Sequence, residues 1–224
     1  FDEVLQALVD GQASANADII RGFAGRADTL SGGTGDDELV GLSGDDAYIV
    51  ERQSGTKIID DRGSSSGDLL TFTNFSSDEV TVRRTDPVGD DVLLSFVDGS
   101  EVIIKGGLDT ANSSAIETIE FADGVSWGIS ELRAQVISSS QTDNNDIVSG
   151  FAGDDVLEGG RGNDVMLGAD GSDTFVFNRF DGRDIVNDSG TDAAETDTLR
   201  LVGYTADDIE LRRLHGESDD VVVT

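Results

Sequence analysis

The chain has 224 residues, and 46 Asp and Glu against 15 Lys and Arg give it a formal net charge of -31. This negative charge excludes electrostatic binding to nucleic acids or anionic membranes, and it favours cation binding where the acids recur at fixed positions. Cys is absent and His215 is the only His, which excludes disulfide bonds, thiolate metal sites and histidine-ligated zinc.

The first segment, residues 1–15, has the pattern of a short amphipathic helix. Apolar residues stand at positions one, four, five, eight and nine of Phe1 to Val9, which is helical spacing. Phe1 in place of an initiator Met favours an excised fragment. No apolar run approaches the roughly 18 residues that a membrane-spanning helix needs.

Residues 16–50 repeat with a period of nine. Gly stands at positions one and four, Asp at six and a large apolar residue at eight, as in Gly32 to Val40 and Gly41 to Ile49. Asn16 to Arg21 supplies the end of an earlier repeat. Gly22 to Ser31 is one residue too long, because Arg26-Ala27 stand where one residue is expected before an Asp. The charge of Arg26 makes this the position where a bound cation is least expected.

This period predicts stacked coils. Gly allows tight turns whose carbonyls point inward, and the last three residues of each repeat form a short strand with position eight in the core. Two repeats make one coil, so Asp residues eighteen apart lie one above the other. Such columns of carboxylates repel unless a cation lies between them. Oxygen ligands without Cys or His favour calcium.

Residues 51–128 show the alternation of short strands instead. The turn signals Asp98-Gly99 and Asp123-Gly124 predict antiparallel hairpins, arranged as a β-sandwich or meander after the coils. Trp127, the only Trp, is interpreted as a core anchor. Ser130 to Ile137 has helical spacing and predicts a helix within residues 129–143.

From Asn144 the chain repeats its first half with a shift of 127 to 129 residues. Residues 144–177 hold a second run of nonapeptides, and Gly150 to Phe177 is its most regular part. Residues 178–224 are expected to form a truncated antiparallel region, because they contain no counterpart of Val102 to Trp127. The repeating unit is therefore about 128 residues long, and an exposed strand edge is expected in its second copy.

The segments Gly22 to Val50 and Gly150 to Phe177 closely resemble the RTX family, whose haemolysin-type nonapeptide repeats bind calcium. Ile116 to Trp127, IETIEFADGVSW, resembles the segment that accompanies these repeats in large bacterial surface proteins. The resemblance implies an all-β fold with two parallel β-rolls, each followed by an antiparallel sandwich or meander, with short connecting helices. It also implies several Ca²⁺ ions, at least two per roll, and export by type I secretion.

In the family each ion lies between neighbouring turns. Its ligands are the backbone carbonyls at repeat positions two and four of one turn, those at positions one and three of the turn in the next coil, and the side chains of the Asp at position six in both turns. Carried over to the first half, the implied ligands are Asn16, Asp18, Phe23, Gly25, Asp28, Gly32, Thr34, Asp37, Gly41, Ser43 and Asp46. In the second half they are Asn144, Asp146, Phe151, Gly153, Asp155, Gly159, Arg161, Asp164, Gly168, Asp170, Gly171 and Asp173. A further ion against the following coil would use Gly33, Gly35, Gly160 and Gly162, with Asp60, Asp61, Asp184 and Asp188 as candidates. Plain turn and surface positions are the favoured interpretation of those four acids.

Three functions remain open. The favoured hypothesis is a noncatalytic calcium-binding module of a large secreted or cell-surface bacterial protein, which folds after export and acts as a spacer or stalk. The alternatives are the accessory module of a secreted protease, lipase or polysaccharide epimerase, and an adhesin module that binds a glycan or a protein. No catalytic residue and no cofactor other than calcium is expected. The expected partners are calcium ions and the type I secretion apparatus, with no nucleic acid and no membrane span.

Overall fold

The computed structural model describes residues 2–63, 65–109, 116–190, 194–213 and 221–223. His215 lies outside these residues. The chain divides into two compact units, residues 1–139 and residues 140–224, and each is described by itself. Both units are built mainly from short β-strands, and two α-helices occur in the described residues. The expected all-β class with parallel rolls is confirmed.

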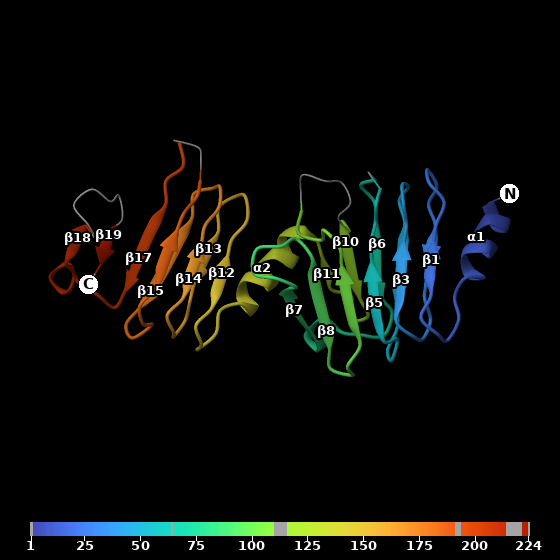
Figure 1. Ribbon diagram of the computed structural model, residues 1–224, viewed down its shortest axis with the longest axis horizontal. Helices are drawn as coiled ribbons and strands as arrows, with labels where there is room; N and C mark the ends of the chain where they lie inside the picture. Colours follow the sequence, from blue (N-terminus) through green and yellow to red (C-terminus); the bar gives the residue numbers. More distant parts are fainter. Residues whose placement is uncertain (1, 64, 110–115, 191–193, 214–220, 224) are drawn as a thin grey trace. The chain divides into compact units, whose positions relative to one another are not determined.

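The first unit contains two parallel ladders (Figure 1). One ladder consists of β1 (Ile19–Arg21), β3 (Asp37–Val40), β5 (Thr56–Ile59) and β9 (Glu101–Ile104). The other consists of β2 (Thr29–Leu30), β4 (Ala47–Val50), β6 (Leu69–Phe72) and β10 (Thr118–Phe121). Successive strands in the chain alternate between the ladders from β1 to β6, as a flattened coil of two nonapeptides per turn requires.

Antiparallel pairing begins only at the end of this roll. Strands β7 (Val80–Arg84) and β8 (Val92–Phe96) extend the first ladder as a meander, and β11 (Ser126–Trp127) pairs with β10. The hairpins expected at Asp98-Gly99 and Asp123-Gly124 are therefore present. A 3₁₀ turn, η1 (Ser77–Glu79), leads into β7.

Residues 51–128 were expected to form antiparallel strands, but part of this segment pairs in parallel. Strand β5 pairs with β9, and β6 pairs with β4 and β10, all in the parallel direction. The roll continues past Val50 although the nonapeptide spacing has stopped. Alternation of apolar residues predicts strands but does not determine the direction of their neighbours. The stack of coils already formed supplies open parallel edges, and the next strands add to those edges.

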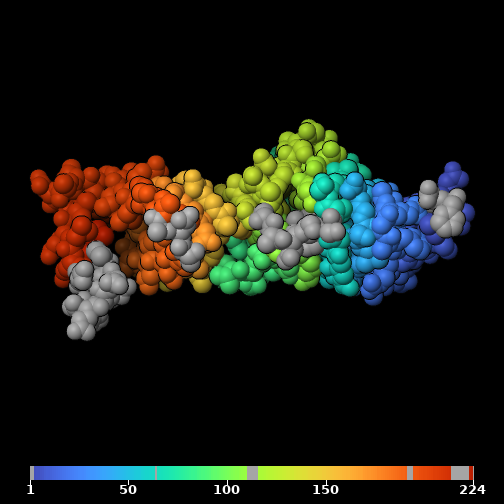
Figure 2. Space-filling model, turned by 90° about the horizontal axis from the view of Figure 1, so that it is seen from above, coloured from blue at the N-terminus to red at the C-terminus, as the bar shows by residue number. Residues whose placement is uncertain are grey.

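The helices lie where helical spacing predicts them. Helix α1 spans Asp2–Asp10, and α2 spans Ile129–Ser139. Helix α2 packs on β7 and buries Leu132, Val136 and Ile137. Its segment forms a ridge on the surface of the first unit in the view of Figure 2.

The core of the first unit has two parts. Inside the roll, apolar residues at position eight such as Leu39 and Tyr48 are fully buried, as the repeat predicts. Beyond it, aromatic rings form a cluster around Phe72, whose centroid lies 4.7 Å from Phe96 and 5.3 Å from Phe121. Trp127 is buried against Phe121 at a centroid distance of 4.5 Å, which confirms its role as a core anchor.

The second unit is also a roll of two parallel ladders. One ladder holds β12 (Ile147–Ser149), β14 (Val165–Leu167) and β16 (Ile185–Asn187). The other holds β13 (Val156–Glu158), β15 (Thr174–Asn178) and β17 (Thr198–Val202). After the 3₁₀ turn η2 (Ala206–Asp208), β18 (Leu211–Arg213) and β19 (Val221–Val223) form an antiparallel pair. Parallel pairing thus continues past Phe177, where an antiparallel region was expected.

None of the helices in the described residues has the length and apolar content to cross a membrane.

Candidate metal centre

Four columns of acidic residues run along the rolls, two in each unit. Each member stands at or directly before the start of a parallel strand, so the columns follow the strand stacking. In the first unit the columns are Asp18 with Asp37, and Asp28, Asp46 and Asp68 followed by Glu117. In the second unit they are Asp146, Asp164 and Asp184, and Asp155, Asp173 and Asp197.

One hydrogen bond repeats along every column. The backbone N–H of each Asp donates to the Oδ1 atom of the Asp one coil further on, over distances of 2.7 to 3.0 Å. In the first unit, the N–H of Asp68 donates in the same way to Oε2 of Glu117 at 2.8 Å. This bond holds one carboxylate oxygen at the turn edge and leaves the second oxygen for another partner.

The turns are too narrow for side chains at the Gly positions one and four, except at Gly25 and Gly153, where a Cβ would meet no atom within 4 Å. Gly162, at position four, has φ of +143°, and a Cβ there would collide with the carbonyl oxygen of Asn144 in the coil before. Gly159, at position one, lies under Oδ2 of Asp164, which a Cβ would also meet. The repeat therefore brings backbone carbonyls and carboxylate oxygens together at one edge.

The position-three carbonyls of the predicted ligand sets take part in these turns. The carbonyl of Ser43 accepts the N–H of Gly25 at 2.5 Å, and that of Asp170 accepts the N–H of Gly153 at 2.7 Å. A carbonyl oxygen has two lone pairs, so that of Asp170 can accept this bond and still face a cation, whereas that of Ser43 also accepts the N–H of Arg26 at 3.1 Å.

Several buried carboxylates have an oxygen atom without a hydrogen-bond donor in the described part of the chain. These atoms are Oδ2 of Asp46, Asp164 and Asp173, and the three residues are at most 1% exposed. A buried charged oxygen without a partner costs several kcal/mol. The donor set of carboxylates and carbonyls fits a hard cation such as calcium.

Within the described residues, two groups of three carboxylates occupy equivalent places at the last nonapeptide of each unit. In both groups, one oxygen from each residue lies within 4.8 Å of the others. The first group is Asp46, Asp61 and Asp68, and the second is Asp173, Asp188 and Asp197. At about 4 Å and an effective dielectric constant of about 20, two like charges repel by about 4 kcal/mol.

The electrostatics of the first group reflect this crowding. Burial raises the pKa of Asp46 from 3.8 to about 6, and the carboxylates of Asp28 and Asp68 raise it too. Burial and the charge of Asp68 raise the pKa of Asp61 to about 7. The Tyr48 hydroxyl donates to Oδ1 of Asp61 at 2.9 Å, and burial next to that carboxylate raises the pKa of Tyr48.

In the second unit the shifts have the same direction and cause. Burial raises the pKa of Asp173, of Asp184 and of Asp188, and neighbouring carboxylates raise each of them as well. A bound cation would reverse this effect, because it favours the charged form of each acid.

Two basic side chains already face the columns of the first unit. The Nζ atom of Lys57, whose side chain is fully buried, lies 2.8 Å from Oδ2 of Asp37. The Nε atom of Arg26 lies 3.2 Å from Oδ1 of Asp28, where the repeat has its extra residue.

Several column members were not among the residues predicted from the repeat. They are Asp68, Glu117 and Asp197, while Asp184 was a candidate for a different ion. Their signal is an acid directly before a short apolar strand, as in Asp68-Leu69-Leu70, but the pair of Gly at positions one and four is incomplete before each of them. Of the other candidates, Asp61 and Asp188 belong to the carboxylate groups, and Asp60 accepts a hydrogen bond from Nε of Arg62 at 2.8 Å.

Comparison with known proteins identifies the repeats. Residues 24–54 and 141–175 match the family described as RTX calcium-binding nonapeptide repeat (4 copies). The chain carries RTX calcium-binding repeats. Residues 91–131 match the haemolysin-type calcium binding protein related domain, which includes the segment IETIEFADGVSW that resembled it in sequence.

Two further comparisons concern whole proteins. No curated protein matches the chain. Among solved structures, the crystal structure of the extracellular lipase LipA from Serratia marcescens is similar at 17% identity with a TM-score of 0.27. That similarity covers 95% of this RTX chain and 35% of the lipase chain.

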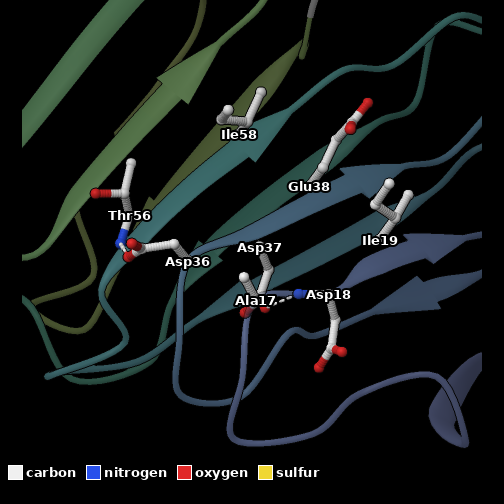
Figure 3. A pocket seen from close by; sticks show the side chains of 8 residues that line it. All are labelled: Ala17, Asp18, Ile19, Asp36, Asp37, Glu38, Thr56 and Ile58. Atoms are coloured by element: carbon white, nitrogen blue, oxygen red, sulfur yellow. Dashed lines mark hydrogen bonds between the residues drawn. The ribbon is translucent and has the colours of Figure 1, made fainter.

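A depression of about 430 Å³ lies over strands β1, β3 and β5 of the first unit, beside the column of Asp18 and Asp37 (Figure 3). The dashed line from Asp18 in Figure 3 is its backbone hydrogen bond to Asp37, and Asp36 accepts the N–H of Thr56 at 2.9 Å nearby. The residues around it are Ala17, Asp18, Ile19, Asp36, Asp37, Glu38, Thr56 and Ile58. Asp18, Asp36 and Asp37 serve the turns and the column, and Glu38 pairs with Arg62 at 3.3 Å, so the depression lies beside the column already described.

Proposed function

We propose that the chain is a noncatalytic module whose folding is coupled to calcium, in a large secreted or cell-surface bacterial protein exported by type I secretion. In that protein the module acts as a spacer or stalk. The finer parts of this proposal, which are export and the spacer role, rest on the kind of proteins that carry RTX repeats and on the 128-residue internal repeat.

One observation carries the proposal: buried carboxylate columns in a chain of net charge -31 leave oxygen atoms without donors. Without cations, the repulsion within the columns opposes folding. Calcium bound between turns would remove this repulsion and supply partners for the orphaned oxygens. In the calcium-poor cytoplasm the chain would stay unfolded, which suits passage through an export channel.

The energetic scale supports this coupling. A ligand at ten times its dissociation constant stabilises the folded state by roughly 1.4 kcal/mol per site. Several such sites together reach the 5–15 kcal/mol that is typical of a whole domain's stability.

The test is circular dichroism of the full chain in chelator and in millimolar calcium. We expect the spectrum of an unfolded chain in chelator and a β-rich spectrum in calcium. Magnesium serves as the matched control, because it demands near-octahedral geometry and gives up its water reluctantly. A β-rich spectrum that is the same in chelator and in calcium would reject coupled folding, and hydrolase activity in the isolated chain would reject the noncatalytic assignment.

A further inference from the structure

Lys57 is a buried lysine at the centre of the first roll. Its side chain is fully buried, and its Nζ atom has three oxygen neighbours. It lies 2.8 Å from Oδ2 of Asp37, donates to the carbonyl of Gly35 at 2.6 Å and donates to the carbonyl of Ser54. An ammonium group has three N–H donors, so all of them have acceptors here.

The oxygens around this ammonium include two that the repeat assigns to a metal ion. Asp37 stands at position six of its nonapeptide, and Gly35 stands at position four. Strand pairing aligns Asp37 directly with Lys57. Lys57 therefore occupies the place in the column where an acid would otherwise stand.

The second unit contains the same place with the opposite charge. A shift of 127 residues takes Asp37 to Asp164 and Lys57 to Asp184. Strand β14 pairs with β16 so that Val165 lies beside Ile185, which puts the two acids at the same level. The N–H of Asp164 donates to Oδ1 of Asp184 at 3.0 Å.

The backbones around the two places agree in detail. In the first unit the N–H of Thr56 donates to Oδ1 of Asp36 at 2.9 Å, and in the second the N–H of Arg183 donates to Oδ1 of Asn163 at 3.0 Å. Gly55 lies against the carbonyl of Gly35, and Gly182 lies against the carbonyl of Gly162, where a Cβ would meet the oxygen at an even shorter distance. The two sites differ in the side chain at the level of Lys57 and Asp184, on closely similar backbones.

This difference in charge affects the Asp residues aligned with these side chains, Asp37 in the first unit and Asp164 in the second. Asp164 is 1% exposed, and its Oδ2 atom has no hydrogen-bond donor among the residues described. The equivalent Oδ2 atom of Asp37 faces the lysine ammonium. Arg26 gives a second case, because its guanidinium faces the otherwise unpartnered Oδ1 of Asp28.

We propose that the Lys57 ammonium replaces a calcium ion in the first unit, and that the equivalent position of the second unit, at Asp164 and Asp184, binds calcium. This inference rests on the proposed calcium-binding function. A tethered ammonium is present at any calcium concentration, so this level of the first roll keeps its positive charge when calcium is scarce. The same level of the second roll depends on the ion.

The test exchanges the two side chains in the full chain and counts the bound ions. Lys57→Asp copies the second unit and is expected to gain one calcium per chain. Asp184→Lys copies the first unit and is expected to lose one, and the double exchange restores the original number. The count comes from equilibrium dialysis against calcium followed by elemental analysis of protein and metal.

Matched controls make the same charge changes on the surface. Lys105→Asp alters a side chain that pairs with Asp91 and is 46% exposed, and Asp207→Lys alters an exposed acid. Neither is expected to change the ion count. Trp127 fluorescence reports whether the first unit is folded in each variant, because the only Trp lies in its aromatic core.

The outcomes separate this inference from the proposed function. A wild-type chain that binds no calcium would contradict both. Unchanged counts in folded Lys57→Asp and in Asp184→Lys, with calcium bound to the wild type, would overturn the inference alone. If Lys57→Asp does not fold, Asp184→Lys decides: loss of one ion supports the inference and an unchanged count overturns it.

Discussion

At the scale of single residues, Gly and Asp of the RTX repeat perform one task together. The carboxylate at position six turns back over the Gly at position one, as Oδ2 of Asp164 does over Gly159. The Gly at position four lets the next coil approach a backbone carbonyl closely, as Gly162 does at Asn144. The pair of Gly positions thus brings together the oxygen atoms that the Asp column needs.

Replacement of Gly162 by Ala should therefore destabilise the second unit. The new Cβ would collide with the carbonyl oxygen of Asn144, and φ of +143° strains any L-residue. We expect a loss of about 1–3 kcal/mol in calcium, measured by thermal unfolding of the full chain followed by circular dichroism.

Gly153→Ala is the matched control for this change. Gly153 also has a positive φ, of +121°, but a Cβ there would meet no atom within 4 Å. The control carries the backbone strain without the collision, so it should cost less. Equal losses in the two variants would show that the close approach of the coils does not matter.

The spacing of nine predicts the buried position-eight residues and the stacking of Asp residues eighteen apart. It does not predict Lys57, because the motif has ended before this residue and a lone Lys in a polar strand pattern is typical of the surface. Only the parallel register of β3 and β5 shows that Lys57 is aligned with Asp37. The residues outside the motif thus required the three-dimensional structure.

At the scale of elements, the first roll ends in a cap that the second roll lacks in its described residues. The meander β7-β8-β9, strand β11 and helix α2 surround the aromatic cluster of Phe72, Phe75, Phe96, Phe121 and Trp127. Leu70 in the first unit is fully buried. Its equivalent in the second unit is Leu199, which is 45% exposed. The cap therefore closes the apolar interior of the first roll.

The hairpins of this cap were predictable and the parallel strands were not. An Asp-Gly turn fixes a local connection, so the pairs β8-β9 and β10-β11 follow from the sequence. The pairing of β5 with β9 joins Thr56 to Glu101 across a long connection, and no local pattern reports such a contact.

Truncation of the central ring of the cap should separate its contribution from that of calcium. Phe72→Ala removes a fully buried side chain that contacts three other rings, and we expect a loss of about 3–5 kcal/mol. Trp127 fluorescence during chemical unfolding in saturating calcium measures this loss in the first unit.

The exposed Val97 supplies the control, since Val97→Ala removes apolar atoms that are 72% exposed. Its unfolding curve should coincide with that of the wild type. A Phe72→Ala curve that also coincides would mean that the aromatic cluster does not hold the cap in place.

At the scale of the whole molecule, the net charge of -31 and the buried acids make stability depend on both protons and calcium. Protons and metal ions neutralise the same carboxylates, so each should compensate for the loss of the other. This reciprocity sets the expected response of the chain to pH, and the sign of that response depends on whether calcium is present.

In chelator, the first unit should become less stable as the pH rises from about 5 to about 8. The folded pKa of Asp46 is raised from 3.8 to about 6 and that of Asp61 to about 7, so the folded state holds these protons more tightly than the unfolded state. Their stabilisation is complete below about pH 3.8 and is lost as the pH rises through 6 and 7.

In saturating calcium the dependence of stability on pH should reverse, because protons then compete with the ion for the same oxygens. The measurement is the folded fraction of the first unit, from Trp127 fluorescence at one temperature across this pH range, because in chelator the chain should be unfolded near neutral pH and regain structure only as these acids are protonated. Asp46→Asn is expected to flatten the chelator profile, and the exposed-site variant Asp78→Asn is expected to leave it unchanged. Chelator and calcium profiles with the same slope would contradict the assignment of these carboxylates to a shared cation site.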